Sequence, residues 1–123
     1  MLYCYKAKCI KVVDGDTVDL MVDLGMHVHV KERFRLAGIN TPEIHGVKKE
    51  SEEYARGMDA KLEVERLILG KEVIVKTEKD KKGKYGRYIA YIYTDLDYDS
   101  VIFYDSSLND HLVKEGFAVA VNY

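Results

Sequence analysis

The sequence predicts a mainly β (α+β) fold, a small and mostly antiparallel barrel of five strands. One long helix follows the third strand and a shorter helix follows the fifth. Three observations support this fold class. The predicted elements run strand, strand, strand, helix, strand, strand, helix, which differs from the alternating pattern of parallel α/β folds. Gly, Asp and a single Pro punctuate the strands, and 123 residues with 47% hydrophobic content suffice for one core. We therefore expect a single domain over residues 1–123.

The first three strands are predicted over residues 2–13, 17–24 and 27–37. The first two are rich in Val, Ile, Tyr and Cys, and Asp14-Gly15 between them is a hairpin signal. In the third strand, alternation places Phe34 and Leu36 on one face and Arg33 and Arg35 on the other. Pro42 then ends regular structure.

The long helix is predicted to begin after Ser51, whose hydroxyl can cap it, with Glu52 and Glu53 near the positive end of its dipole. Gly70 is expected to end the helix in a left-handed conformation. The helix should pack through an apolar stripe of Ala55, Met58, Leu62 and Leu69, with Val64 and Ile68 nearby.

The second half of the chain predicts a fourth strand over Lys71–Thr77, a charged loop over 78–86 and a fifth strand over 87–94. A shorter helix over 107–115 is expected, capped by Ser106 or Ser107 and stopped at Gly116. Three strands, a helix, two strands and a helix match the OB-fold barrel, in which a helix closes one end.

Composition restricts the kinds of partner that the chain can have. The formal net charge is −2, so a polyanion would need a local basic patch, for which the sequence offers Lys48, Lys49, Lys81, Lys82 and Lys84. No apolar run is long enough for a membrane span, and lysines interrupt the start of the chain before a signal peptide could form. Cys4 and Cys9 would face opposite sides of one strand, which favours free thiols. We expect a cytoplasmic monomer without a membrane partner.

Two short segments carry the chemistry: Asp14-Gly15-Asp16-Thr17, and Arg33-Phe34-Arg35 followed by Asn40-Thr41-Pro42-Glu43. Carboxylates bind hard cations, arginines bind phosphate, and a further glutamate can activate water. Together they predict metal-assisted phosphodiester cleavage. Each segment alone is also consistent with an ordinary turn or a solvated strand face.

The chain resembles the staphylococcal-nuclease-like (thermonuclease) family in four motifs that occur in register. These are Ile10-Lys11-Val12-Val13-Asp14-Gly15-Asp16-Thr17; Phe34-Arg35-Leu36 with Thr41-Pro42-Glu43; Lys84-Tyr85-Gly86-Arg87 with Ala90-Tyr91-Ile92-Tyr93; and Leu108-Asn109 with Leu112-Val113 and Gly116. The resemblance implies an OB-fold phosphodiesterase that uses Ca²⁺ to cut DNA or RNA, acting as an endonuclease.

The resemblance also implies a role for each matching residue. Asp16 and the backbone carbonyl of Thr41 would hold the metal, Arg35 and Arg87 would contact the scissile phosphate, and Glu43 would be the general base. Lys84 and Tyr85 would bind the nucleotide, and Tyr123 stands near a position where the family has a stacking tyrosine.

Asn40 departs from the family pattern, which has an acid immediately before Thr-Pro-Glu. An amide still offers an oxygen to the metal, but it brings no charge, so we expect a weaker calcium site or one completed by Asp14. This departure and the acidic net charge keep a second hypothesis open. In that hypothesis the chain is a non-catalytic OB-fold module that binds single-stranded nucleic acid or a protein partner.

Overall fold

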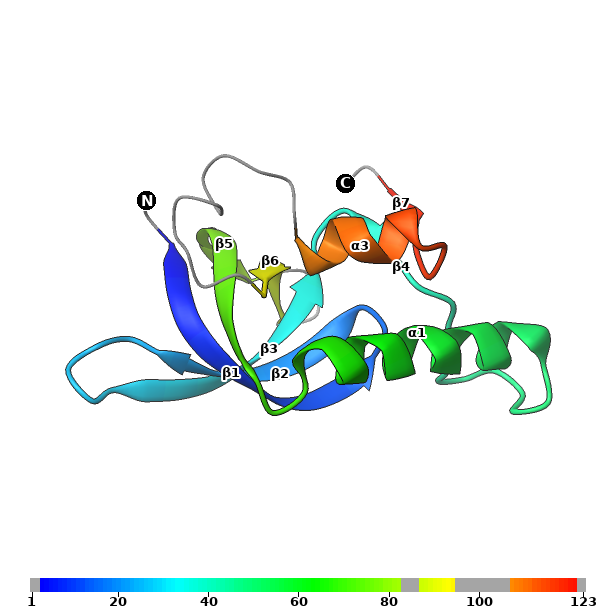
Figure 1. Ribbon diagram of the computed structural model, residues 1–123, viewed down its shortest axis with the longest axis horizontal. Helices are drawn as coiled ribbons and strands as arrows, with labels where there is room; N and C mark the ends of the chain where they lie inside the picture. Colours follow the sequence, from blue (N-terminus) through cyan, green and yellow to red (C-terminus); the bar gives the residue numbers. More distant parts are fainter. Residues whose placement is uncertain (1–2, 83–86, 95–106, 122–123) are drawn as a thin grey trace.

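The computed structural model of the protein describes residues 3–82, 87–94 and 107–121, which fold into a closed barrel with two helices (Figure 1). Its elements are β1 (Cys4–Asp14), β2 (Thr17–Asp23), β3 (His29–Leu36), β4 (Ile39–Asn40), α1 (Glu52–Ile68), β5 (Glu72–Lys82), β6 (Tyr88–Tyr93), α3 (Leu108–Lys114) and β7 (Val119–Ala120). The barrel order is β1-β2-β3-β6-β5, with β3 and β6 parallel and the other pairs antiparallel. The predicted mainly β class, five-stranded barrel and positions of the two helices are confirmed.

The β1–β2 hairpin turns at the predicted Asp14-Gly15. Asp14 pairs with Thr17 across it, and the carboxylate of Asp14 accepts a hydrogen bond from the backbone nitrogen of Asp16 at 3.1 Å. Gly15 takes no positive φ. A Cβ there would lie 2.8 Å from the Cβ of Ala60 and 2.9 Å from the side chain of Thr41, so the close approach of α1 and Thr41 requires glycine.

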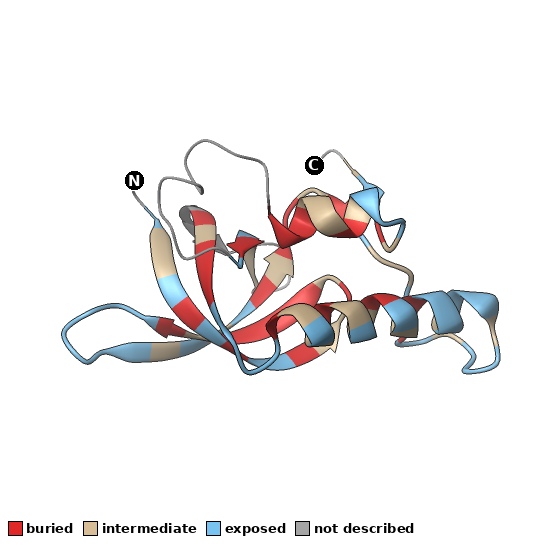
Figure 2. Cartoon of the chain, viewed as in Figure 1, coloured by how far each residue is buried: buried red, intermediate tan, exposed pale blue. Residues whose placement is uncertain are grey.

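Helix α1 begins and ends as predicted. The hydroxyl of Ser51 accepts a hydrogen bond from the backbone nitrogen of Tyr54 at 3.1 Å, and Gly70 has φ of 75°. The predicted apolar stripe is confirmed at Val64 and Ile68, which are buried, and is wrong at Leu62 and Leu69, which are 55% and 40% exposed. The buried face carries Gly57, Ala60, Val64 and Ile68, and Figure 2 shows it turned toward the barrel.

The strands differ from the prediction mainly in three ways. β5 continues to Lys82, into the predicted charged loop, because β6 pairs with it as far as Lys82↔Tyr88. β3 begins at His29, and residue 27 lies in a turn with φ of 63°. The two-residue strands β4 and β7 pair with each other and were not predicted.

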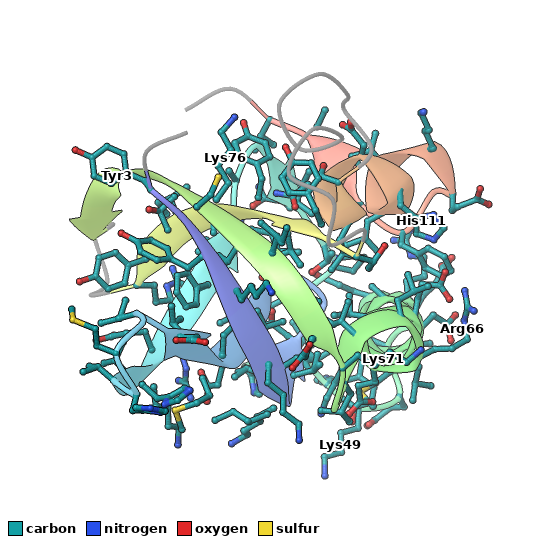
Figure 3. All side chains as sticks on the ribbon, turned by 60° about the vertical axis from the view of Figure 1, so that its left-hand side comes forward. Tyr3, Lys49, Arg66, Lys71, Lys76 and His111 are labelled. Carbon is teal, nitrogen blue, oxygen red and sulfur yellow. The ribbon has the colours of Figure 1, made fainter. Side chains whose placement is uncertain are left out.

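Helix α3 is fixed to the barrel by a buried amide. Ser107 caps its first turn, and the side chain of Asn109 donates to the carbonyl oxygens of Ala37 (2.9 Å) and Ala90 (3.1 Å). It also accepts from the backbone nitrogen of Ile92 at 3.3 Å. Glu63 of α1 lies 2.8 Å from His111 of α3, and Figure 3 shows His111 and Arg66 on the same side of the molecule.

Both cysteines are free thiols, as predicted. Within the described residues, no helix combines the length and apolar character needed to cross a membrane.

Candidate functional site

The predicted site residues gather where the β1–β2 turn, the end of β3 and the segment after β4 meet the start of β6. They border a cavity of about 760 Å³, lined by Asp14, Asp16, Arg35, Leu36, Asn40, Thr41, Glu43, Glu53, Arg87 and Ile89. A neighbouring cavity of about 550 Å³ shares Asn40, Thr41 and Glu53 with it. The fold thus brings together both segments singled out in the sequence and adds Arg87 from a third.

Asp16 is at the centre of this group. One carboxylate oxygen accepts from the backbone nitrogen of Thr41 at 3.1 Å and lies 3.4 Å from Nη1 of Arg35. The other oxygen accepts from the hydroxyl of Thr17 at 3.2 Å. The side chains of Asp16 and Arg35 are only 13% and 12% exposed, so each has a direction fixed by its neighbours.

Asp14 and Asp16 differ in how readily their carboxyl groups ionise. The pKa of Asp14 is raised to about 6, chiefly by burial and also by its hydrogen bond to Asp16, the charge of Asp16 and the charge of Glu43. Burial opposes ionisation of Asp16 too, but the hydrogen bond from Asp14, the charge of Arg35 and the backbone nitrogen of Thr41 outweigh it and lower its pKa. Asp16 is therefore the ionised member, with Asp14 as its hydrogen-bond donor at acidic pH.

Arg35 and Arg33 have different environments, although both lie on the outer face of β3. Arg35 donates to the carbonyl oxygens of Leu36 (3.0 Å) and Ile39 (2.8 Å) and to the side-chain oxygen of Asn40. Arg33 pairs with Asp19 at 2.8 Å and does not border the cavity. Only Arg35 of this pair belongs to the site.

Arg87 lies just before β6, which runs parallel to β3 with Arg35 paired to Ile89. Its Nη1 donates to the hydroxyl of Thr17 at 3.4 Å, and its side chain lines the same cavity as Arg35. Two arginines from adjacent strands thus face one cavity. Lys84, Tyr85 and Tyr123 lie outside the described residues.

Glu43 is exposed at the cavity, on a segment that α1 holds in place. A Cβ added to Gly57 would lie 2.5 Å from Ile44, 2.6 Å from the carbonyl of Pro42 and 3.1 Å from that of Glu43. The backbone around Glu43 therefore rests directly on the helix. Glu53 also borders the cavity, a position that the sequence does not indicate because an acid in a first helical turn is already explained by the helix dipole.

The oxygen atoms at the cavity are of the types that bind a hard cation, but few of them carry a negative charge. Asp16, the Asn40 amide and the Thr41 carbonyl are ligand types that calcium takes, and Asp14 is adjacent. Among the residues that the structure describes, no three or more His, Cys, Asp or Glu side chains are grouped closely enough to hold a metal. A metal here would depend on neutral oxygens besides Asp16.

Comparisons with known proteins show which family the chain matches. A family model described as staphylococcal nuclease homologue matches residues 33–123. This span includes Arg35, Asn40, Thr41, Glu43 and Arg87 but not Asp16.

Curated relatives match most of the chain. The uncharacterized protein MJ1439 of Methanocaldococcus jannaschii is 35% identical over 130 residues, covering 93% of this chain and 58% of that protein. The thermonuclease of Staphylococcus hyicus is 29% identical (94% of this chain, 59% of the relative). The micrococcal nuclease of Shigella flexneri is 30% identical (97% and 60%). The chain thus spans less than two thirds of the length of the curated relatives that it matches.

Proposed function

The chain belongs to the staphylococcal nuclease homologue family, and on this premise we propose that it is a nuclease that hydrolyses phosphodiester bonds of DNA or RNA. The observation that carries the proposal is the placement of Arg35, Arg87 and Glu43 around one cavity beside the ionised Asp16. Two guanidinium groups and an exposed carboxylate are suited to hold a phosphodiester and to activate a water molecule. The names of two relatives, thermonuclease and micrococcal nuclease, support this assignment.

The two arginines would bind and orient the phosphate. A guanidinium offers several donors in one plane and can contact two phosphate oxygens at once. Because negative charge grows on these oxygens as the water attacks, the contacts are stronger in the transition state than in the ground state. Arg35 is already fixed by the carbonyls of Leu36 and Ile39, so little of its freedom remains to be lost when substrate binds.

Glu43 would act as the general base. Its carboxylate is exposed at the cavity, where it can take a proton from a water molecule that attacks in line with the leaving oxygen. The contact of its backbone with Gly57 limits its movement relative to Arg35.

Calcium is the cofactor that we propose, held by Asp16, Asn40 and the carbonyl of Thr41, with Lys84 and Tyr85 as nucleotide contacts. A bound Ca²⁺ would supply positive charge next to the phosphate. Asp16 provides the only firmly ionised carboxylate of this set, so we expect weak affinity.

A non-catalytic module that binds single-stranded nucleic acid or a protein is the second candidate. It is favoured by Asn40, which replaces a charged metal ligand and accepts a hydrogen bond from Arg35. The presence of Glu43 argues against it, because a binding module has no need of a base.

Cleavage of circular single-stranded DNA and of RNA, measured over a calcium titration and in EDTA, tests the proposal. Calcium-dependent cutting of the circle would also establish endonuclease action. Glu43→Gln should lower the rate by about 10²–10⁴ while binding persists, whereas Glu50→Gln, an exposed acid of the same segment, should retain activity. No cleavage at any calcium concentration would refute the nuclease in favour of the binding module.

A further inference from the structure

A row of basic side chains continues from Arg35 along the outer face of β3. His29, Lys31, Arg33 and Arg35 alternate with residues that face the barrel, and β3 pairs with β2 without a register break from Thr17↔Arg35 to Asp23↔His29. Successive members are about 6.6 Å apart along the strand. This spacing resembles that of successive phosphates on an extended single strand of nucleic acid.

A second row of cations lies on β1, on the opposite side of β2. Lys8 and Lys31 both pair with Met21, and Lys11 and Arg33 both pair with Asp19. The two rows are two strand spacings apart, about 9.6 Å. The outer face of β2 is therefore a strip bordered by cations, and it runs toward the cavity at Arg35.

The positive charge of this strip is only partly neutralised. The outer faces of β1–β3 beyond the cavity carry more positive than negative side chains. The positive ones are Lys6, Lys8, Lys11, Lys31 and Arg33, and the negative ones are Asp19 and Asp23. Glu72 of β5 also lies opposite Lys8. Asp19 is buried and paired with Arg33, and Asp23 accepts from the backbone nitrogen of Gly25.

The four lysines are exposed, and their side chains have no hydrogen bond or ion pair with any residue that the structure describes. The pKa of Asp19 is lowered first by its hydrogen bond from Arg33 and further by the charges of Lys31 and Lys11, which agrees with their position around it. The whole chain carries −2, so this surplus is local.

The cations that border this strip are Lys6, Lys8, Lys11, Lys31 and Arg33, which we call the basic track. We propose that the basic track binds the backbone of single-stranded nucleic acid that leads out of the cavity. The proposal deepens the proposed function and rests on it for the identity of the substrate. The outer-face positions of β1–β3 hold no Phe, Tyr or Trp side chain, so the contacts are with phosphates and confer no sequence preference. A single strand fits because one phosphate row can lie between the two cation rows.

The test is fluorescence anisotropy with labelled oligonucleotides in EDTA, where calcium-dependent cleavage cannot occur. Lys8→Gln/Lys11→Gln/Lys31→Gln removes three track lysines whose side chains form no hydrogen bond or ion pair with a described residue, and Arg33 stays in place so that buried Asp19 keeps its partner. The matched control is Lys61→Gln/Lys76→Gln/Lys114→Gln, with the same change in charge on α1, β5 and α3. Thermal melts establish that both variants are folded.

We expect the track variant to bind a single-stranded octanucleotide at least about tenfold more weakly than the wild type in low salt. The slope of log K against log salt should become shallower by about 2, because each phosphate contact on a single strand contributes about 0.7. The control variant should behave as the wild type, and the difference between variants should be much smaller for a dinucleotide.

Three results would overturn the track: octanucleotide affinity equal in the track and control variants, absence of octanucleotide binding by the wild type, or tighter binding of a duplex octamer than of the single strand. None of these depends on hydrolysis. Weakened binding in the track variant together with no calcium-dependent cleavage by the wild type would support the track and refute the nuclease. Calcium-dependent cleavage by the wild type, together with equal octanucleotide affinity in the track and control variants, would support the nuclease and refute the track.

Discussion

Arg35 donates a hydrogen bond from Nη2 to the side-chain oxygen of Asn40, so a candidate phosphate ligand and a candidate metal ligand share one contact. The same guanidinium lies 3.4 Å from Asp16. An amide oxygen has two lone pairs and no charge, whereas a carboxylate at this position would have four acceptor sites and a full negative charge. Position 40 therefore limits how strongly the cavity can attract a cation.

Asn40→Asp should strengthen calcium binding by about tenfold, which corresponds to about 1.4 kcal/mol. The added carboxylate raises the charge of the donor set and can still accept from Arg35. Calorimetric titration with Ca²⁺ measures the change, and Asn40→Ala, which removes the oxygen, should weaken binding. Equal affinity in the three proteins would mean that residue 40 does not contact the ion.

Arg35→Lys and Arg87→Lys should each lower kcat by about 10²–10³ with smaller effects on KM, by analogy with the loss of one oxyanion-hole donor. Lysine keeps the charge but lacks the planar fork. Steady-state kinetics on a labelled oligonucleotide measure the effect, and Arg66→Lys on the exposed side of α1 is the control. A rate within a few fold of the wild type for either site variant would show that charge alone suffices there.

Gly57→Ala should impair both stability and catalysis. Alanine favours a helix interior by about 1 kcal/mol over glycine, but its Cβ would lie 2.5 Å from Ile44 and 2.6 Å from the carbonyl of Pro42. The segment that carries Glu43 would have to move away from α1. We expect a lower melting temperature and a lower kcat.

The control for this variant is Gly70→Ala. Its Cβ meets no atom within 4 Å, but its φ of 75° strains a side chain. It should destabilise the protein without changing kcat. A Gly57→Ala variant more stable than the wild type would show that the segment yields easily.

The sequence allowed accurate prediction where local chemistry decides the structure. Ser51, Ser107 and Gly70 mark helix ends because capping depends on residues within one turn. Asp14 marks the hairpin for the same reason, because its carboxylate accepts a hydrogen bond from the backbone nitrogen of Asp16. The site segments could be identified because their residue types suit phosphate and metal chemistry, and the fold brings them to one cavity.

Features decided by distant contacts could not be predicted. The buried face of α1 contains Gly57 and Ala60, whose small size allows close packing but contributes little to a hydrophobic pattern. The pattern therefore favours the larger Leu62 for the buried stripe, although the structure exposes it. The partners of Asn109 lie 17 to 72 positions away in the chain. The basic track depends on the register between β1, β2 and β3, which the separate lysines do not reveal.

Glu63→Gln should destabilise the protein at neutral pH and have little effect near pH 2. Glu63 receives two hydrogen bonds from Arg66, both at 2.9 Å, and its carboxylate lies 2.8 Å from His111 of α3. These contacts, Arg66 first, lower the pKa of Glu63 from 4.5 to about 2. A carboxylate with a depressed folded-state pKa contributes stability above its unfolded pKa, and this is lost as the pH falls from about 4.5 toward 2.

The expected loss at pH 7 is about 1 kcal/mol, because solvent screens a pair whose arginine side chain is 65% exposed. Urea unfolding at pH 7 and pH 3 measures the difference from the wild type, which should shrink at the lower pH. Glu65→Gln, on the same helix and with a side chain that has no hydrogen bond or ion pair among the described residues, is the control. A difference for Glu63→Gln that stays constant over this pH range would show that packing between α1 and α3, rather than the charge of Glu63, accounts for the effect.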